Sequence, residues 1–402
     1  MKVLVLNSGS SSIKYQLFNM QDKSVLAAGS VEQIGEPGSH LSHSLHTGPG
    51  GMNKTVRTLP IPDHRQGFEL IASVLRETGA LADTGELKGI GHRVVHGGEK
   101  FKEPVRVTPE VLAAIRALIP LAPLHNPANL LGMEVALESA PAVPQVAVFD
   151  TAFHQSIPSH AYRYAIPKKL YEAYQIRRYG FHGTSHRYVA KKAAEFLEKP
   201  LTSLNLISLH LGNGASAAAI QQGRCIDTSM GLTPLEGLIM GTRCGDLDPA
   251  IIFYLVRETG LTSGEIESIL NKESGLKGIC GANDMRTVGE LAAGGDPEAQ
   301  LAISMYCYRI KKYIGAYHAV LVGGLNVLIF TGGIGEHADF IRAGCCEGLA
   351  HLGLEMDAGK NSRDRAECVA LESMASRVKI LVIPTNEELE IAEQTVACLG
   401  AD

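Results

Sequence analysis

The 402-residue chain lacks the features that mark membrane-bound or secreted proteins. No run reaches the roughly 18 consecutive apolar residues that a membrane-spanning helix needs. The N-terminus passes from Met1 and Lys2 directly into V-L-V-L and then a polar turn, which leaves no room for the apolar segment and cleavage site of a signal peptide. We therefore expect a cytoplasmic protein that does not bind membranes.

An excess of positive charge is also absent, since the formal net charge is -5. Such a balance argues against a nucleic-acid-binding or anionic-membrane surface, so an anionic ligand must meet a local cluster of donors. The eight cysteines form no C-x-x-C pair and all lie in the second half of the chain. This spacing argues against a zinc site or a disulfide framework and favours reduced thiols.

The remaining composition, 45% apolar and 20% charged, is that of an ordinary globular protein. A chain this long exceeds the usual size of one hydrophobic core, so we expect two domains. The residue pattern predicts strands over 2–6, 13–18 and 89–96, a strand ending at Asp150, and helices that begin near Thr108 and Pro127. Strands that alternate with helices indicate an α/β architecture.

The segment L-I-S-L-H-L-G-N-G-A-S-A-A-A-I at 206–220 repeats the pattern of the N-terminus, with a short turn of Asn, Gly and Ser between two apolar strands. This repeat indicates an internal duplication with one phosphate-facing hairpin in each half. We also expect helices over 185–198, 296–322 and 387–399 and a strand over 326–330 before the turn T-G-G-I-G-E. No linker rich in Pro or Ser separates the halves, so we expect them to share a cleft and a hinge.

The turn N-S-G-S-S-S-I-K at 7–14 has the means to hold phosphate, because Gly9 lets the backbone approach, the hydroxyls donate and Lys14 adds a cation. It is not a Walker loop, since it lacks the G-x-x-x-x-G-K order and leads into a strand. A plain hairpin turn would explain this segment alone. Two further glycine turns, at 212–214 and 332–335, also follow strands, where ligands of α/β sheets bind. Together the three turns predict a phosphotransferase.

Longer motifs carry a specific resemblance from residue 4 to residue 389. They are V-L-N-S-G-S-S-S-I-K, H-R-V-V-H-G-G, P-L-H-N-P, F-D-T-A-F-H, Y-G-F-H-G-T-S-H, H-L-G-N-G-A-S, M-G-T-R-C-G-D-L-D-P, F-T-G-G-I-G-E and I-P-T-N-E-E-L. In content and order they resemble the acetate kinase family. The resemblance implies two duplicated ribonuclease H-like (actin-like ATPase) domains with an interdomain active-site cleft. The first would span 1–150 and be completed by the helix 387–402, and the second, 151–386, would bind the nucleotide. It also implies a homodimer.

The resemblance further implies the site residues. Acetate would be bound by Arg93 and by an apolar wall of Val95, Leu124 and Pro234, and the catalytic positions are Asp150, His182 and Arg243. Asn7 and Glu387 match metal-binding positions for Mg²⁺, or Mn²⁺ in its place. The positions for ATP or ADP and its phosphates are Ser10, Ser12, Lys14, His210, Leu211, Gly212, Asn213, Gly214, Asp284, Met285, Arg286, Gly332, Gly333, Ile334, Gly335 and His337.

The chemistry of these residues leaves alternatives open. A short carboxylate suits the planar fork of an arginine, but an internal ion pair is the commoner fate of Arg93 or Arg243, with Asp246 or Asp248 as partners for Arg243. His182 can donate to a migrating phosphoryl group, whereas His210, inside a strand, suits a core histidine equally well.

Two carboxylates have a structural alternative of their own. Asp150 ends a buried-looking strand and can organise magnesium or substrate, or cap the next segment. Glu387 lies in T-N-E-E, which also reads as a capping box of Thr385 and Glu388.

The resulting hypothesis is reversible, direct in-line transfer of the ATP γ-phosphoryl group to acetate, giving acetyl phosphate and ADP. The alternatives are a propionate or butyrate kinase of the same fold, and a non-catalytic nucleotide switch of the actin or Hsp70 type. Valine at position 95 favours acetate, because a smaller residue would enlarge the pocket. His337 stands where family members often carry asparagine and Met285 where an aromatic residue is expected, so the preference among phosphoryl donors stays open.

Overall fold

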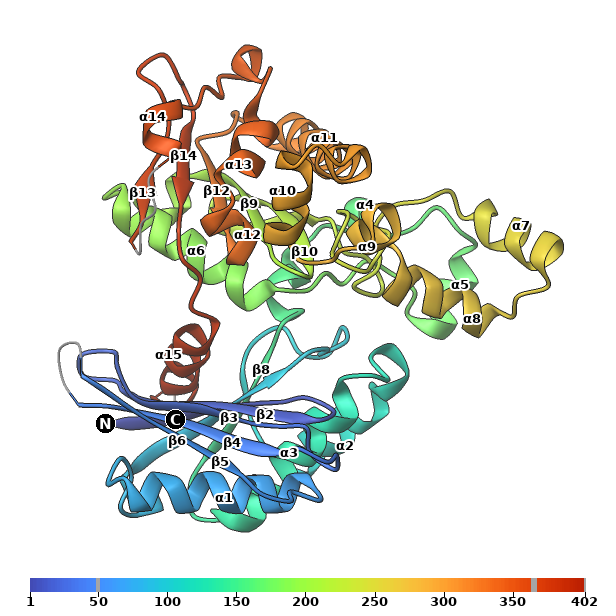
Figure 1. Cartoon of the computed structure of the whole chain (residues 1–402). Coiled ribbons are helices and arrows are strands. Elements are labelled where there is room, and N and C mark those ends of the chain that lie inside the picture. The colour runs from blue at the N-terminus through green and yellow to red at the C-terminus, as the bar shows by residue number, and fades with distance from the viewer. Residues whose placement is uncertain (48–50, 363–366, 401–402) are drawn as a thin grey trace. The chain divides into compact units, whose positions relative to one another are not determined.

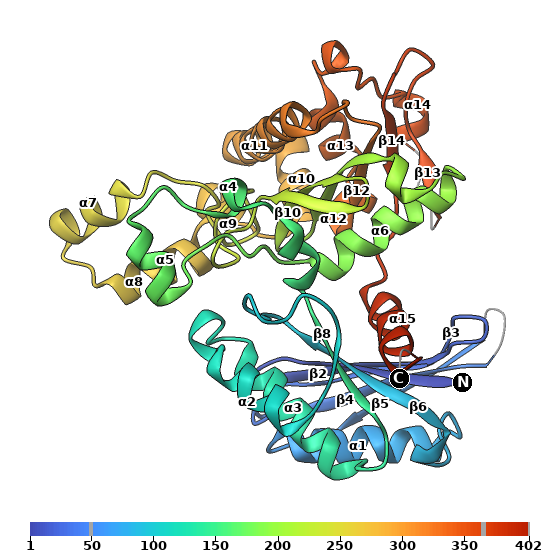
Figure 2. The same ribbon diagram turned by 180° about the vertical axis from the view of Figure 1, so that it is seen from behind.

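The structure is a computed structural model that describes residues 1–47, 51–362 and 367–400. The chain divides into two compact units, which are described separately. Unit 1 comprises Met1–Phe153 and Asn386–Asp402, and unit 2 comprises His154–Thr385 (Figures 1 and 2). Within the described ranges, every helix is too short or too polar to span a bilayer.

Unit 1 consists of one sheet with helices on both faces. Its strands are β1 (Lys2–Ser8), β2 (Ser12–Asn19), β3 (Ser24–Glu32), β4 (His40–His46), β5 (Met52–Thr58), β6 (Leu87–Val94), β7 (Val105–Arg106) and β8 (Gln145–Phe149). Its helices are α1 (His64–Glu77), α2 (Pro109–Ala117), α3 (Asn126–Ser139), and, from the far end of the chain, α15 (Glu387–Gly400). The strand order is β5-β4-β3-β2-β1-β6-β8-β7.

Coverage of both sheet faces explains the sequence of β1. Helices α1 and α3 pack on one face, and α15 packs on β1, β6 and β8 from the other (Figures 1 and 2). The successive residues Val3, Leu4, Val5 and Leu6 are therefore all buried, as expected of a strand between two helical layers. The start of α2 is as predicted, because the Thr108 side chain accepts a hydrogen bond from the Val111 amide and Pro109 fills the first turn.

Unit 2 contains a second sheet with the order β11-β10-β9-β12-β14-β13. Its strands are β9 (Asn205–Leu211), β10 (Ala215–Gln221), β11 (Arg224–Thr228), β12 (Val327–Thr331), β13 (Val369–Ala370) and β14 (Lys379–Val382). Its helices are α4 (Ser159–Tyr162), α5 (Lys168–Tyr174), α6 (Gly183–Phe196), α7 (Ala250–Thr259), α8 (Ser263–Ser268), α9 (Gly275–Cys280), α10 (Met285–Ala293), α11 (Pro297–Val320), α12 (Gly332–His337), α13 (Asp339–Cys346) and α14 (Ala358–Asn361). Helix α6 covers one face and α11 the other (Figures 1 and 2).

The two sheets share a five-strand core, which confirms the predicted duplication. In unit 1 the order β3-β2-β1-β6-β8 has an antiparallel hairpin β1–β2, an antiparallel β3, and β6 and β8 parallel to β1. In unit 2 the strands β11-β10-β9-β12-β14 have the same order and directions. The N-terminal hairpin and the hairpin at 205–221 are thus equivalent elements of two copies of one fold.

A buried histidine in unit 1 gives the protein a pH-dependent stability. His92 of β6 is 2% exposed and its Nε2 lies 2.7 Å from Gln145 Oε1. Burial lowers the pKa of His92 to about 4 from a usual value of 6.5. The unfolded chain therefore binds a proton between these two values that the folded chain does not, and stability falls as the pH drops through this window.

We expect His92→Gln to reduce this acid sensitivity, since it removes the titrating group but keeps a polar contact for Gln145. Between about pH 7.5 and about pH 5, the variant should lose about 2 kcal/mol less free energy of unfolding than the parent chain. Urea unfolding followed by circular dichroism measures the difference. The exposed His46→Gln is the matched control and should behave like the parent. Equal pH sensitivity in all three proteins would contradict the prediction.

Candidate active site

A cavity of about 580 Å³ lies in unit 2. This volume is within the usual range of small-molecule sites, and two of the lining segments directly follow the parallel strands β9 and β12, where ligands of α/β sheets bind. Its walls are Gly212, Asn213, Asn283, Asp284, Met285, Arg286, Gly333, Ile334, His337, Ala338 and Phe340. The three segments that the sequence assigned to the nucleotide, at 212–214, 284–286 and 332–337, therefore meet at one cavity.

After Thr331, the residues Gly332–His337 form a short helix, α12, where a plain turn was predicted. The chain enters this helix through Gly332, whose φ of 75° and whose approach to Leu211 exclude a side chain, because a Cβ there would lie 2.7 Å from the Leu211 carbonyl oxygen. Glu336 accepts the Gly332 amide at 2.9 Å and the Thr385 amide at 3.1 Å. A Cβ at Gly333 would meet nothing within 4 Å, so this wall of the cavity stays open.

Asn283, Ala338 and Phe340 line the cavity but were missed by sequence reasoning. Phe340 belongs to α13 and lies against Gly289 of α10, so its place depends on contacts between helices distant in sequence. Asp284 caps α10 by accepting the Arg286 and Thr287 amides, and this N-cap pattern was a signal available for the 283–286 segment.

Next to the hairpin β9–β10, His182 belongs to a chain of hydrogen bonds. Its Nδ1 lies 2.9 Å from the Ser216 hydroxyl, which lies 2.8 Å from His186 Nε2, and His186 Nδ1 lies 3.0 Å from the Ser208 hydroxyl. Burial lowers the pKa of His186 well below its usual range, so this ring is neutral. These hydrogen bonds fix the plane of the His182 ring and occupy its Nδ1. Sequence reasoning missed His186 and Ser216.

His210 is both a buried histidine and a neighbour of the predicted site. Its ring stacks on that of His182 with 4.3 Å between centroids, and its Nδ1 lies 2.8 Å from the Ser185 hydroxyl, which contacts the Thr385 hydroxyl at 2.8 Å. The two alternatives for His210 are therefore compatible, because a satisfied core histidine can support a catalytic one.

Arg243 is half-buried and has no carboxylate partner among the residues that the structure describes. Its Nη1 donates to the Pro234 carbonyl at 3.2 Å, and no ion pair of Arg243 occurs among the residues that the structure describes. The proposed partner Asp246 instead lies 3.5 Å from Arg309 and accepts from Tyr313 at 2.9 Å, and Asp248 accepts the Ala250 amide. The ion-pair alternative for Arg243 is thus wrong among the described residues, and burial lowers the pKa of the guanidinium.

Gly214 shows that Arg243 and His182 lie together. A Cβ at this glycine would be 3.5 Å from His182 Nε2 and 3.6 Å from Arg243 Nη1. A half-buried cation and an imidazole nitrogen therefore face one small space beside the turn 212–214. Such an arrangement suits an anion, and in particular the developing charge of a transferring phosphoryl group.

Unit 1 holds a second charged cluster, at the ends of β6 and β8. Arg93 donates from Nε and Nη2 to Asp150 Oδ2, at 3.0 and 2.6 Å, and its Nε lies 4.0 Å from Glu387 Oε2. Arg93 is therefore in an internal ion pair, the alternative that its sequence context favoured. Burial first, and then the charges of Asp150 and Glu388, raise the pKa of Glu387 to about 7, while Arg93 opposes the shift. The cluster holds more negative than positive charge.

The phosphate-loop residues surround the turn between β1 and β2. Asn7 and Lys14 face each other across the hairpin, and Gly9 closes the turn through a bond from its amide to the Ser12 carbonyl at 2.8 Å. Ser10 and Lys14 are exposed, and Ser12 is half-buried.

Asn129, which sequence reasoning missed, connects this turn to β6. It donates to the Ser8 carbonyl at 2.7 Å and accepts the Val95 amide at 3.0 Å, so one buried amide holds the ends of both strands. The predicted apolar wall is divided between the units. Val95 is half-buried in unit 1, Leu124 is 73% exposed there, and Pro234 belongs to unit 2.

The start of α15 differs from the predicted capping box. Asn386 caps the helix by accepting the Leu389 amide at 2.9 Å, while the Thr385 hydroxyl contacts Ser185. Asparagine is as good a cap as threonine, and it is one residue closer to the first helical residue, Glu387. Across residues 1–47, 51–362 and 367–400, no three His, Cys, Asp or Glu side chains are arranged to hold a metal ion by themselves.

Three features define a phosphotransferase of the actin-like class. They are two sheets with the same strand order, a cavity of small-molecule size at the strand ends of unit 2, and an arginine near it that has no carboxylate partner among the described residues. The Acetokinase family model matches residues 2–393. An acetate kinase of Syntrophobacter fumaroxidans is 55% identical over 98% of this chain and 96% of its own, and one of Dictyoglomus thermophilum is 52% identical over the full length of both. The chain belongs to the acetokinase family.

Solved structures agree. The crystal structure of Porphyromonas gingivalis acetate kinase has a TM-score of 0.94 at 45% identity and covers 99% of both chains. A propionate kinase from Francisella tularensis has a TM-score of 0.92 at 44% identity and covers 98% of this chain and 99% of its own. The expected fold class, two actin-like units, is confirmed by this agreement.

Proposed function

We propose that this chain is an acetate kinase, which transfers the γ-phosphoryl group of ATP reversibly to acetate and gives acetyl phosphate and ADP. Family membership over nearly the whole chain supports the reaction. The structural observation that carries it is Arg243, a half-buried guanidinium with no carboxylate partner in the described residues, beside His182. A half-buried cation without a carboxylate partner suits a site that a bound anion completes.

The acceptor needs a cation but no base. Acetate is ionised at neutral pH and attacks as an anion, so the work of the protein is to orient it and to neutralise charge. We assign the carboxylate to Arg93, whose fork already binds one carboxylate, that of Asp150. Val95, Leu124 and Pro234 are assigned to the methyl group. Arg243 and His182 are assigned to the oxygens of the transferring phosphoryl group, in a direct in-line step.

The donor nucleotide is assigned to the cavity of unit 2, with the turns at 212–214 and 332–335 next to its phosphates. His210, Leu211 and the loop residues Ser10, Ser12 and Lys14 are the further phosphate-binding positions in this proposal. ATP and ADP are the co-substrates that the family uses. A titration comparing ATP, GTP and pyrophosphate tests the donor, for which Met285 and His337 are the cavity residues that depart from the expected types.

Phosphoryl transfer from ATP also needs a divalent cation, and we propose Mg²⁺, or Mn²⁺ in its place. Asn7, Asp150 and Glu387 offer oxygen ligands, and burial first, then the charges of Asp150 and Glu388, raise the pKa of Glu387, so a cation beside this carboxylate would favour its ionised form. A few oxygen ligands fit Mg²⁺, which takes one or two carboxylates and completes its shell with water and substrate phosphates. When bound, the cation would neutralise phosphate charge. Asp150 also keeps Arg93 in place.

Acetate-dependent release of ADP from ATP, measured with the purified chain, tests the proposal. A non-catalytic nucleotide switch would bind ATP through the cavity but would release ADP at the same rate with and without acetate. Formation of acetyl phosphate, trapped as the hydroxamate, identifies the product. ATP binding without acetate-dependent turnover would contradict the proposal.

Propionate is the nearest alternative acceptor, since one similar solved structure is a propionate kinase, but it is not favoured over acetate. One methylene changes binding by only about 1 to 3 kcal/mol, so some propionate activity is expected. Val95→Ala should enlarge the acceptor pocket and raise the propionate-to-acetate ratio of kcat/KM about 10-fold. Initial rates with both acceptors measure it. Val56→Ala, at a valine that is 57% exposed in β5, is the control, and an unchanged ratio in Val95→Ala would remove this residue from the pocket.

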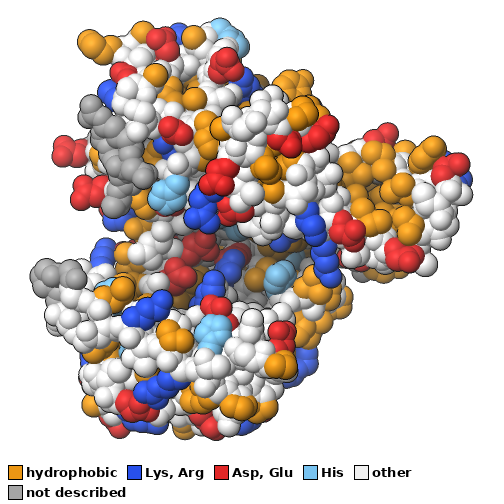
Figure 3. Space-filling model, in the orientation of Figure 1, with side chains coloured by type: hydrophobic (Ala, Val, Ile, Leu, Met, Phe, Trp, Pro, Cys, Tyr) orange, Lys and Arg blue, Asp and Glu red, His pale blue; other side chains and the backbone are white. Residues whose placement is uncertain are grey.

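We further propose that the protein is a homodimer. Helix α7 buries none of its residues and exposes Ile251, Phe253, Tyr254 and Val256, and Figure 3 shows hydrophobic side chains gathered on the lobe that carries α7 and α8. Helix α11, which was expected to offer an interface, buries one side and exposes Leu301, Met305 and Tyr308 on another. Apolar patches of this kind mark association surfaces. Light scattering measures the mass in solution.

A cytoplasmic location stays a prediction.

A further inference from the structure

A long segment without helix or strand, residues 229–246, carries both Pro234 and Arg243 and is called the Arg243 loop here. Long irregular loops inside compact units are usually functional, and one that places a catalytic side chain must be held by something other than secondary structure. Backbone hydrogen bonds to neighbouring segments hold part of this loop, for example from the Cys244 amide to the Leu270 carbonyl at 3.1 Å. Two arginines outside the loop, Arg178 and Arg309, add side-chain contacts to it.

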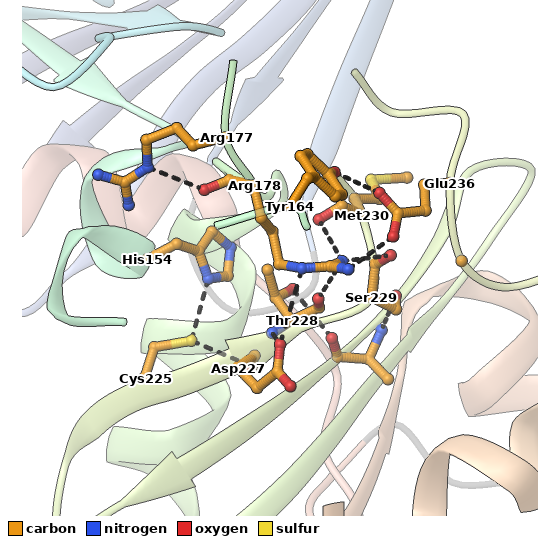
Figure 4. A network of polar contacts seen from close by, with 12 residues as sticks. His154, Tyr164, Arg177, Arg178, Cys225, Asp227, Thr228, Ser229, Met230 and Glu236 are labelled. Carbon is orange, nitrogen blue, oxygen red and sulfur yellow. Dashed lines mark hydrogen bonds and ion pairs between the residues drawn. The ribbon is translucent and has the colours of Figure 1, made fainter. Parts of the chain in front are cut away.

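Arg178 binds the first half of the Arg243 loop. Its Nη1 donates to three successive carbonyls, those of Thr228 at 2.7 Å, Ser229 at 3.1 Å and Met230 at 3.2 Å. Its Nη2 donates to Glu236 Oε1 at 2.6 Å. Figure 4 shows the guanidinium lying between these carbonyls and the Glu236 carboxylate. One planar fork thereby joins the start of the loop to a residue near its middle.

The second carboxylate oxygen of Glu236 binds Tyr164, and the three residues Arg178, Glu236 and Tyr164 are called the clamp here. Tyr164 donates its hydroxyl hydrogen to Glu236 Oε2 (Figure 4). The same hydroxyl accepts the Leu232 amide at 3.1 Å. Gly231 allows the carboxylate to come this close, because a Cβ there would lie 1.9 Å from Glu236 Oε2. Residues on both sides of Pro234 are thus fixed by Arg178, Glu236 and Tyr164.

The clamp reaches the site through Pro234. Its carbonyl accepts Arg243 Nη1 at 3.2 Å, and Pro234 lies two residues before Glu236. Arg309 donates to the Gly237 carbonyl, near the middle of the loop, at 2.8 Å and lies 3.5 Å from Oδ2 of Asp246 at the end of the loop. Arg243 itself has no carboxylate to hold it among the described residues, so its place depends on the backbone of this loop.

We propose that Arg178 is a positioning residue for phosphoryl transfer, holding through Glu236 the loop that sets both the Arg243 guanidinium and the Pro234 wall. The inference rests on the proposed function, since those two residues are assigned roles in it. It predicts that damage to the clamp changes turnover and acceptor choice together, without a direct contact between Arg178 and any substrate.

The test compares Arg178→Lys, Arg178→Met and Tyr164→Phe with the parent and with Arg224→Lys, a change at an exposed arginine of β11. Lysine keeps the charge but cannot bridge the carbonyls and Glu236 at once. Misplacing a catalytic group by about 1 Å can cost about 100-fold, so kcat with acetate should fall by about that factor in Arg178→Met and by less in Arg178→Lys and Tyr164→Phe. KM for ATP should stay within about twofold, because the clamp lies outside the cavity.

Acceptor choice separates positioning from a merely structural role. The propionate-to-acetate ratio of kcat/KM should change at least about threefold in the Arg178 variants, whereas loss of folded enzyme lowers both rates equally. Thermal unfolding shows which variants fold, and Tyr164→Phe, which loses one hydroxyl, serves if the Arg178 variants do not.

Three results would overturn or redirect the inference. A folded variant with the parent's kcat and ratio overturns it, and so does a lower kcat with an unchanged ratio. A parent chain that fails to phosphorylate acetate tells against the proposed function instead.

Discussion

Replacing Arg243 with alanine should lower kcat about 1000-fold while changing ATP affinity far less. An arginine that stabilises the transferring phosphoryl group acts mainly in the transition state, so its loss appears in turnover and not in ground-state binding. Arg243 suits this role because it lies beside His182 and Gly214 and, among the described residues, no carboxylate neutralises it. Steady-state rates, with nucleotide affinity measured by direct titration, give both numbers.

Two controls accompany this prediction, one at another arginine and one at Arg243 itself. Arg224→Ala removes an exposed arginine of the same unit and should leave kcat unchanged. Arg243→Lys keeps a positive charge without the fork and should recover only part of the rate. Turnover near that of the parent in Arg243→Ala would remove this residue from the mechanism.

Replacing Arg93 with alanine should lower kcat/KM for acetate about 100-fold and should also destabilise unit 1. Both effects come from the same fork, because Arg93 is assigned to the substrate carboxylate and already compensates Asp150, which is 1% exposed. Removing one partner of a buried pair costs about 3 to 5 kcal/mol, since the other charge is left uncompensated. Acetate kinetics and urea unfolding measure the two effects separately.

A double variant separates binding from stability. Arg93→Met with Asp150→Asn removes both charges, so it should regain much of the stability and none of the acetate affinity. Arg65→Ala, which breaks an exposed ion pair with Glu138, is the surface control and should cost less than about 1 kcal/mol. If Arg93→Ala destabilises the unit but leaves KM for acetate unchanged, Arg93 serves the ion pair alone.

Sequence reasoning succeeded where the signal was local. The unbroken apolar run at residues 3–6 indicated a strand, and it is apolar throughout because helices cover both faces of its sheet. Thr108 and Pro109 indicated the start of α2, because both residues act on the first turn of the helix that they begin. The hairpin at 205–221 was predicted as a copy of the first because the strands keep their apolar pattern. The cavity is lined by segments at 212–213, 284–286 and 333–337, which contain positions that the family resemblance assigned to the nucleotide.

The rest depended on contacts between distant residues. Three glycines disfavour a helix at 332–337, yet α12 forms because Glu336 binds amides at both Gly332 and Thr385. Asn129 binds Ser8, which lies 121 residues earlier in the sequence. Arg178 binds Thr228 and Glu236, which lie 50 and 58 residues later. No periodicity or local spacing in the sequence indicates such partners.

The place of α15 has a consequence for how the protein is made. This helix packs on β1, β6 and β8 and brings Glu387 to Arg93, but the ribosome produces it only after all of unit 2. Unit 2 is one continuous stretch of the sequence, so all its residues are synthesised before α15. Until α15 is made, the face of the unit 1 sheet on which this helix packs lacks that cover. The contact between Glu387 and Arg93 can therefore form only after residue 387 has been synthesised.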